Sequence, residues 1–336
     1  MDAKIGWGIL GCAGIAEKAF IPAVLGSRNG FLAAIAARDE SRARAWAVRF
    51  DIHSALRTYQ DLVEDPTVTA VYIPLPNHLH AEWAVRALRA GKHVLCEKPL
   101  AMNAAEAQAM IAAAQASGVL LMEGFMYKFH PQIEKTLEIV RGGKIGEVRS
   151  VHSSFTFRFA RDRDNYRWSP EMGGGALYDV GCYTLSAARL VFGAEPLSVS
   201  AVARIDPATG VDMTAAALLE FPGGRFAHCD ASFESHFQSR LHVVGTDGTL
   251  SLDRAFSAKD FDVALAIVHG DLRDAVRVHK ADMFRLMAEH FADAVLGRAP
   301  LRYPASDALG NMRAIDACLA SIRSGRTVRD FGIMPA

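Results

Sequence analysis

The first 125 residues alternate between short apolar runs and amphipathic helical patterns, and this rhythm limits the possible folds more than any other feature. Continuous apolar runs without polar alternation are typical of strands buried on both faces of a parallel sheet. Strand–helix–strand alternation therefore predicts a doubly wound α/β domain over residues 1–125. The expected strands are Ile5–Leu10, Phe31–Ala37, Ala70–Pro74, His93–Cys96 and Val119–Glu123, and the expected helices are Ser41–Phe50, Leu79–Ala90 and Asn103–Gly118.

Beyond residue 125 the pattern changes, because strand-like segments follow one another without helices between them. This grouping predicts an α+β domain with a mainly antiparallel open sheet over residues 126–336. The expected strands are Glu147–Phe159, Leu197–Ile205, Thr214–Phe221, Arg225–Phe233 and Leu241–Leu252. The expected helices are Pro131–Arg141, a long helix from the triplet Gly173-Gly174-Gly175 to Phe192, Asp282–Leu296 and Ser306–Ser324.

Composition narrows the possible partners and surroundings. The 37 basic residues balance 37 acidic ones, with no run of like charge, which argues against a nucleic-acid or anionic-membrane partner. No apolar stretch is long enough to span a membrane, and no export signal precedes the first strand. Five scattered cysteines without a CxxC motif indicate reduced thiols in a cytoplasmic protein. His78 and His80 lack acidic or cysteine neighbours at ligand spacing, so no metal is expected.

The turn after the first strand reads Gly11-Cys12-Ala13-Gly14-Ile15-Ala16, a weakened form of the glycine-rich dinucleotide-binding fingerprint. Gly11 would form the tight turn, and Ala13 would replace the glycine that lets the backbone approach the pyrophosphate. The N–H groups that begin the following helix would face the phosphates. A formal GxGxxG match at residues 6–11 lies inside the strand and lacks this context. The residues expected to bind the pyrophosphate are Gly11, Ala13, Gly14, Ile15 and Ala16.

The end of the second expected strand bears on the choice of cofactor. An acidic residue at this place holds the ribose of NAD, whereas an arginine accommodates the 2′-phosphate of NADP. Arg38 and Asp39 follow the strand, and Asp39 is placed to cap the next helix. Arg38 therefore predicts NADP in preference to NAD, although a solvated strand end is the alternative for this arginine.

Lys98 follows the apolar strand His93–Cys96 directly, within Glu97-Lys98-Pro99. In open parallel sheets, ligands bind just outside the carboxyl ends of the strands. A lysine held there loses some hydration, which penalises its charged form. The position predicts a role in chemistry, and a surface lysine is the alternative.

These segments together resemble the Gfo/Idh/MocA family of nicotinamide-dependent oxidoreductases. The motifs occur in the family's order and cover both halves of the chain, and Glu-Lys-Pro is the most specific of them. The segments that carry the resemblance are Trp7–Ala16, Pro76–His80, Gly91–Leu100, Glu123–Pro131 and Gly173–Tyr183.

The resemblance implies a Rossmann dinucleotide-binding domain followed by a substrate-binding and oligomerisation domain. It implies that Lys98 is the catalytic lysine and that Glu97 helps to position the nicotinamide ribose. The remaining residues that it implies at the cofactor are Pro76, Asn77, His80, and, from the loop Asp164–Pro170, Arg167 and Trp168. An ordinary loop with a packed tryptophan is the alternative for the last two.

Tyr183 stands where many members of the family have a histidine. With a tyrosine at this position, the chain resembles the branch of the family that contains glucose–fructose oxidoreductase, NADP-dependent D-xylose dehydrogenase and dimeric dihydrodiol dehydrogenase. The implied reaction removes a proton from a substrate hydroxyl through Tyr183, assisted by Lys98, while a hydride passes to the nicotinamide. Asp179 lies four residues before Tyr183, and it would either orient the sugar or brace the glycine turn.

Three functions remain open on the sequence. The first is an NADP-dependent aldose 1-dehydrogenase that converts a sugar such as D-xylose or D-glucose to its lactone. The second is oxidation of trans-dihydrodiols or reduction of dicarbonyls. The third is a non-catalytic NADP-binding regulatory protein. The resemblance also implies a homodimer or homotetramer that forms through the open face of the second domain's sheet.

Overall fold

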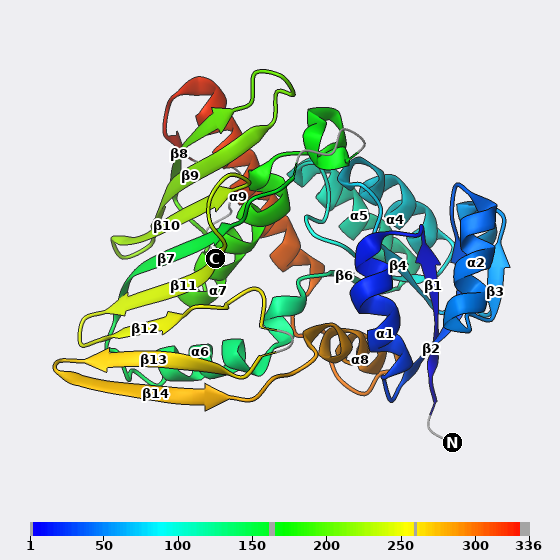
Figure 1. Cartoon of the computed structure of the whole chain (residues 1–336), viewed down its shortest axis with the longest axis horizontal. Helices are drawn as coiled ribbons and strands as arrows, with labels where there is room; N and C mark the ends of the chain where they lie inside the picture. Colours follow the sequence, from blue (N-terminus) through cyan, green and yellow to red (C-terminus); the bar gives the residue numbers. More distant parts are fainter. Residues whose placement is uncertain (1–2, 161–164, 259–260, 330–336) are drawn as a thin grey trace. The chain divides into compact units, whose positions relative to one another are not determined.

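The computed structural model describes residues 3–160, 165–258 and 261–329, which form two compact units (Figure 1). The first unit contains residues 3–126 and 282–309, and the second contains the remainder. The segment 282–309 thus differs from the domain expected over residues 126–336. The physical reason is its packing, because the Phe291 ring lies tilted with its centroid 5.6 Å from that of Trp7, and the Asn29 amide donates to Glu289 O at 2.8 Å.

The sheet of the first unit is entirely parallel, with the strand order β3-β2-β1-β4-β5-β6. This is the Rossmann order. The chain adds strands towards one edge of the sheet up to β3 and towards the other edge from β4, and ligands bind in the crevice at this switch point between β1 and β4. Strands β1 and β4 are buried along their whole length, as the apolar runs predict. The strands are β1 Ile5–Leu10, β2 Gly30–Ala36, β3 Ser54–Leu56, β4 Ala70–Ile73, β5 His93–Cys96 and β6 Leu121–Glu123.

Side-chain caps begin some of the helices of this unit. Asn103 accepts the N–H of Glu106 at the start of α5, and Gly118 ends that helix at a φ of 66°. Thr58 and Asp61 form a capping box at α3, a short helix that the sequence patterns did not predict. The helices are η1 Ala16–Phe20, α1 Ile21–Leu25, α2 Glu40–Phe50, α3 Tyr59–Glu64, η2 Asn77–Leu79, α4 His80–Arg89, α5 Ala104–Ser117 and α8 Met283–Val295.

The second unit contains a sheet with the strand order β14-β13-β12-β11-β7-β10-β9-β8-β15. Its neighbours run antiparallel except for β7 and β10, which are parallel. The single strand expected over Leu241–Leu252 is two strands joined at the Asp247-Gly248 turn, and the hairpin β13–β14 was not predicted. The strands are β7 Val148–Thr156, β8 Ser198–Ile205, β9 Asp212–Phe221, β10 Arg225–Ser232, β11 Gln238–Gly245, β12 Thr249–Leu252, β13 Val263–His269, β14 Leu272–Val278 and β15 Val328–Arg329.

Helix α7 covers the inner face of this sheet and packs against β7 and β10 (Figure 1). Its side chains are buried almost all round, and the long helix expected from the glycine triplet begins as a π-helical turn, η6, that continues into α7. The helices are η3 Met126–Phe129, α6 Pro131–Arg141, η4 Tyr166–Trp168, η5 Pro170–Met172, η6 Leu177–Gly181 and α7 Cys182–Phe192, with α9 Ala305–Ser324 running from the first unit into the second.

Candidate active site

The turn after β1 has the geometry that a dinucleotide pyrophosphate needs. Gly11 adopts a φ of 94°, and its N–H donates to Ala36 O at 2.7 Å. The helix begins at Gly14, where an added Cβ would meet no atom within 4 Å. Ala16 is fully buried, so the helix packs closely on the sheet while Gly14 and Ile15 stay exposed. The first turn of the helix is therefore open to an approaching phosphate.

The end of β2 separates the roles of Arg38 and Asp39. Asp39 caps α2 by accepting the N–H of Ser41 at 2.9 Å, as the sequence predicted, and it also accepts the Ser41 hydroxyl at 2.6 Å. The hydrogen bond from the Ser41 side chain lowers the pKa of Asp39. Arg38 is exposed beside it, and Arg42 donates to Cys12 O at 3.2 Å. The Arg42 guanidinium thus borders the turn, whereas the Asp39 carboxylate is engaged in capping α2.

The loop that carries Lys98 is fixed at several points after β5. Glu97 is 7% exposed and accepts the Tyr72 hydroxyl at 2.7 Å. The N–H of Leu100 donates to the Glu123 carboxylate at 2.8 Å. Lys98 itself is half-buried between these anchors. The strand ends of β4, β5 and β6 therefore all hold the short segment in which the predicted catalytic lysine lies.

His80 bridges two loops at the carboxyl edge of the sheet. Its ring is 1% exposed, with Nδ1 at 2.9 Å from Pro99 O and Nε2 at 2.8 Å from Leu75 O. Burial lowers the pKa of His80 to about 4, although the two carbonyl groups oppose this change. Both ring nitrogens face the protein's own backbone, so His80 joins the loop of Pro76 and Asn77 to the loop of Lys98. Contact of these residues with a cofactor stays a prediction.

In the second unit, the glycine triplet brings a loop against the start of η6. The N–H of Gly174 donates to Ser169 O at 2.8 Å, and that of Gly175 donates to Arg167 O at 3.0 Å. A Cβ at Gly174 would collide with both carbonyl groups, and Gly173 has a φ of 77°. The triplet is thus needed for close backbone packing. Asp164, the first residue of the loop expected here, lies outside the described residues.

Arg167 and Asp179 form a salt bridge across this junction. Arg167 Nε donates to Asp179 Oδ2 at 2.7 Å, and Asp179 is 6% exposed. Burial favours the neutral guanidine, but the charge of Asp179 and the nearby Tyr166 and Tyr183 phenols outweigh it and raise the pKa of Arg167. Arg167 is therefore a permanent cation beside Tyr183, which the sequence did not predict.

Trp168 points into the core of the second unit, where its ring packs 5.8 Å from that of Phe233 and 5.2 Å from that of Phe159. Its indole N–H has no hydrogen-bond partner among the described residues. The predicted contact of Trp168 with a cofactor is not tested by this packing. Within the second unit, Trp168 is a packed core residue, as the alternative interpretation of the sequence states.

Tyr183 lies at the second position of α7, 4% exposed, in an aromatic cluster. Its ring lies 5.3 Å from that of Phe155, 5.6 Å from that of Phe256 and 5.7 Å from that of Tyr127. These aromatic neighbours fix the plane of the ring and exclude water. Because Tyr183 is the second residue of α7, the position of its phenol also depends on where that helix begins.

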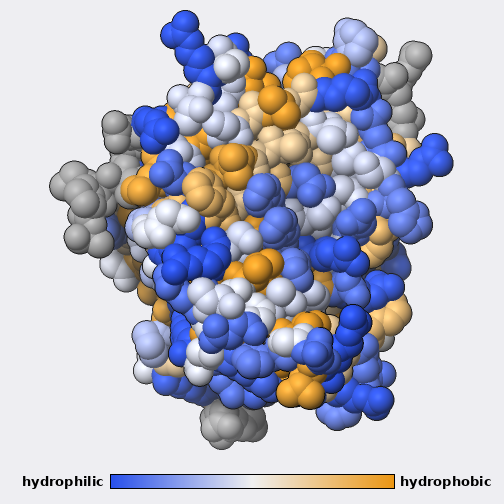
Figure 2. Space-filling model, turned by 90° about the vertical axis from the view of Figure 1, so that its left-hand side faces the viewer, coloured by the Kyte–Doolittle hydropathy of each residue, from blue (hydrophilic) through white to orange (hydrophobic). Residues whose placement is uncertain are grey.

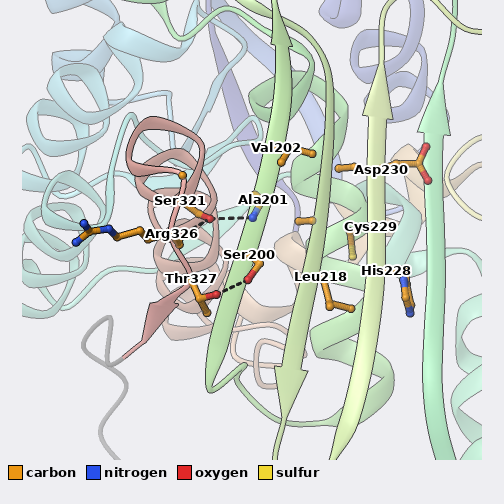
Figure 3. Close-up of a pocket in the computed structure, with 13 residues that line it drawn as sticks. Ser200, Ala201, Val202, Leu218, His228, Cys229, Asp230, Ser321, Arg326 and Thr327 are labelled. Carbon is orange, nitrogen blue, oxygen red and sulfur yellow. Dashed lines mark hydrogen bonds between the residues drawn. The ribbon is translucent and has the colours of Figure 1, made fainter.

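A cavity of about 480 Å³ lies in the second unit between β8, β9, β10 and the segment after α9 (Figure 3). Its lining contains none of the residues predicted at the active site. In the described part of the chain, no group of three His, Cys, Asp or Glu side chains could hold a metal ion. Likewise, no described helix is long and apolar enough to cross a membrane.

Comparison with known protein families shows to which family this chain belongs. The model described as an oxidoreductase family with an NAD-binding Rossmann fold matches residues 5–125, and the GFO/IDH/MocA C-terminal domain model matches residues 133–251. The chain belongs to the Gfo/Idh/MocA family of oxidoreductases. The resemblance and the two-domain α/β fold drawn from the sequence are thereby confirmed.

Relatives in this family act on different substrates. The chain is 41% identical over 324 residues to D-xylose 1-dehydrogenase (NADP(+)) 2 of Haloferax volcanii, covering 96% of this chain and 98% of that protein. It is 34% identical over 271 residues to trans-1,2-dihydrobenzene-1,2-diol dehydrogenase of Mus musculus, covering 80% and 79%. A 3-ketoreductase from Actinomadura kijaniata, solved with NADP and TDP-benzene, superposes with a TM-score of 0.90 at 35% identity, covering 95% and 98%.

Proposed function

We propose that this Gfo/Idh/MocA oxidoreductase is an NADP-dependent aldose 1-dehydrogenase. It would move a hydride between the nicotinamide and the C1 carbon of a sugar such as D-xylose or D-glucose, giving the lactone. The observation that carries the proposal is the 41% identity, over nearly the whole chain, to a D-xylose 1-dehydrogenase that uses NADP. Retention of Lys98 and Tyr183 supports an enzyme rather than a non-catalytic regulator.

NADP is the proposed cofactor. When bound, it would supply the nicotinamide carbon that takes or returns the hydride. Arg38, exposed just after β2, supports recognition of the 2′-phosphate. Asp39 is already engaged as a helix cap, which weakens the case for NAD. The residues proposed to hold the cofactor are Gly11, Ala13, Gly14, Ile15, Ala16, Arg38, Pro76, Asn77, His80, Glu97, Lys98, Arg167 and Trp168.

The proposed acid–base chemistry centres on the Tyr183 phenol. A free tyrosine has a pKa of about 10 and is a weak base at neutral pH. A neighbouring cation stabilises the phenolate, and both Arg167 in the same unit and the proposed partner Lys98 supply positive charge. Tyr183 Oη would take the proton of the substrate hydroxyl. Asp179, held in place by Arg167, would accept a neighbouring hydroxyl and orient the sugar.

Substitution separates these roles. Lys98→Ala and Tyr183→Phe are each expected to abolish turnover of D-xylose and D-glucose and to leave NADP binding within a few-fold. Tyr178→Phe, in the same helical segment, serves as the matched control and should keep activity. NADPH fluorescence measures both turnover and binding. Near-full activity of Tyr183→Phe would refute the acid–base role. Tight NADP binding by the unmodified protein without turnover on any substrate would favour the regulatory alternative.

A second substrate class is favoured by the trans-dihydrodiol dehydrogenase relative. The same substrate panel therefore includes trans-1,2-dihydrobenzene-1,2-diol and, in the reducing direction, a dicarbonyl. A value of kcat/KM for the diol or the dicarbonyl above that for every aldose would move the assignment to this class, while leaving Lys98 and Tyr183 in the same roles.

A homodimer or homotetramer is proposed through the outer face of the second unit's sheet. Residues in register across six strands form a row without Asp, Glu, Lys or Arg side chains, namely Ser200, Leu218, His228, His152, His242 and Ser251. Two arginines of this face are paired within the chain, since Arg204 bonds Glu234 and Arg240 bonds Asp253. Such a face can meet its own copy without like-charge repulsion.

The surface supports this choice of partner. Figure 2 views the side on which the strands of the second unit lie and shows apolar patches among hydrophilic residues. Val202 and Leu218 expose 71% and 42% of their surface, and both border the cavity drawn in Figure 3. Leu218→Glu is expected to yield monomers in light scattering, whereas Leu272→Glu, on the hairpin β13–β14, should not. A monomeric unmodified protein at micromolar concentration would contradict the proposal.

The five cysteines are free and four of them are buried, which supports the cytoplasmic location expected from the sequence.

A further inference from the structure

Asp212 is a buried acid that none of the sequence motifs singled out. It is the first residue of β9 and is 7% exposed. Its Oδ2 accepts the N–H of Leu177 at 2.6 Å, and the N–H of Ala176 also bonds the carboxylate. A strand residue therefore reaches across the unit and holds the first residues of η6.

The third glycine of the triplet makes this contact possible. Gly175 has a φ of 107°, and a Cβ built on it would overlap Asp212 Oδ1. Any side chain at Gly175 would thus push the carboxylate away, in addition to straining the backbone. The Gly173-Gly174-Gly175 motif serves two contacts, one with the loop of Arg167 and one with Asp212.

The helix has no cap of its own at this end. Ala176 occupies the N-cap position and offers no side-chain hydrogen bond. The first N–H groups of a helix need acceptors from elsewhere. Asp212, 35 residues further along the chain, supplies that acceptor.

The same helix carries the residues of the proposed reaction. Asp179 lies two residues after Leu177, and Tyr183 follows in α7 without a break. We propose that Asp212 is a positioning residue that fixes the start of η6–α7 and so sets where Asp179 and the Tyr183 phenol lie. This inference rests on the proposed acid–base role of Tyr183.

Three variants test it. Asp212→Asn keeps an oxygen acceptor of the same shape, and Asp212→Ala removes the acceptor altogether. Asp282→Ala is the matched control, because Asp282 caps α8 by accepting the N–H groups of Phe284 and Arg285 at 3.1 and 3.2 Å. If Asp212 only stabilises the fold, Asp212→Ala and Asp282→Ala will both lower Tm, and both will leave kcat per folded molecule unchanged.

The first readout does not depend on activity. Hydrogen exchange of the Leu177 amide is expected to be about tenfold faster in Asp212→Ala, the value of one lost hydrogen bond, and near the unmodified rate in Asp212→Asn and Asp282→Ala. Unchanged exchange in Asp212→Ala would overturn the anchor itself.

The second readout is turnover of D-xylose with NADP. Asp212→Ala is expected to lower kcat by about 10- to 100-fold, the effect of a small displacement of a catalytic group, with NADP binding within a few-fold. Asp212→Asn should recover most of this loss. Faster exchange in Asp212→Ala with unchanged kcat would overturn the positioning role.

The two proposals fail separately. If the unmodified protein oxidises no substrate, the proposed function fails, and the Tyr183 phenol is titrated instead by ultraviolet difference spectra against Tyr183→Phe. A shifted titration in Asp212→Ala, absent from Asp282→Ala, supports positioning. An unshifted titration overturns it.

Discussion

The protonation state of His80, which joins the loop of Lys98 to the loop of Pro76 and Asn77, can be tested without any substrate. The ring lies between Leu75 O and Pro99 O, at 2.8 and 2.9 Å, and is 1% exposed. A neutral imidazole donates to one carbonyl, whereas a protonated ring donates to both. Burial outweighs the two carbonyl groups and lowers the pKa from 6.5 to about 4. The folded protein therefore holds the neutral ring at pH 7.

The sign of the pH dependence follows from this depressed pKa. As the pH falls below 6.5, the unfolded chain binds a proton at His80 while the folded protein does not. The stability that the neutral ring contributes is complete above pH 6.5 and is lost as the pH falls through the folded value. At about 1.4 kcal/mol per pKa unit, the full loss is about 3 kcal/mol, of which about 2 kcal/mol falls between pH 7 and pH 5.

The assay compares the free energies of unfolding in urea of the unmodified protein and His80→Gln at pH 7, 6 and 5. The difference between them isolates His80, because every other titrating group is common to both. We expect it to shrink by about 2 kcal/mol from pH 7 to pH 5. A His80 difference that grows as the pH falls would refute the neutral ring and indicate a cation held by both carbonyl groups.

Three further substitutions test the cofactor turn and the second unit. Arg38→Ala should weaken NADP binding by about 10- to 100-fold, the value of a charged hydrogen bond, with little effect on NAD; equal losses for both cofactors in fluorescence titrations would contradict its role. Asp39→Ala should lower Tm through the lost cap on α2, while the ratio of NADP to NAD affinity stays unchanged. Arg167→Lys keeps the charge but loses the directed Nε bond to Asp179, and kcat for D-xylose should fall by about tenfold. Unchanged kcat there would show that the salt bridge does not orient the site.

Local patterns predicted the long elements well, because their signals lie within the elements themselves. The buried run Ile5–Leu10 is β1, and the Asn103 cap with Gly118 defines α5. Short, half-exposed elements escaped detection. Strand β3 has only three half-buried residues, and β14 is exposed along most of its length, so neither carries a strong hydrophobic pattern.

Residues 282–309 illustrate a different limit. Their helical pattern was recognised, but an amphipathic helix does not reveal which core its apolar face joins. Contacts with Trp7 and Asn29, more than 250 residues earlier, place α8 in the first unit. Association between distant segments depends on shape and burial in three dimensions, which a sequence window does not contain.

The sequence by itself determined the family and the α/β and α+β division, and it is the source of the prediction that Lys98, Asp179 and Tyr183 carry the chemistry, because each belongs to a short motif with a local physical meaning. The tertiary structure alone decided which groups hold them. His80 meets two carbonyl oxygens, Arg167 meets Asp179, and Asp212 meets the start of η6. These partners become visible only after folding, because buried polar groups must find hydrogen-bond partners wherever the chain brings them.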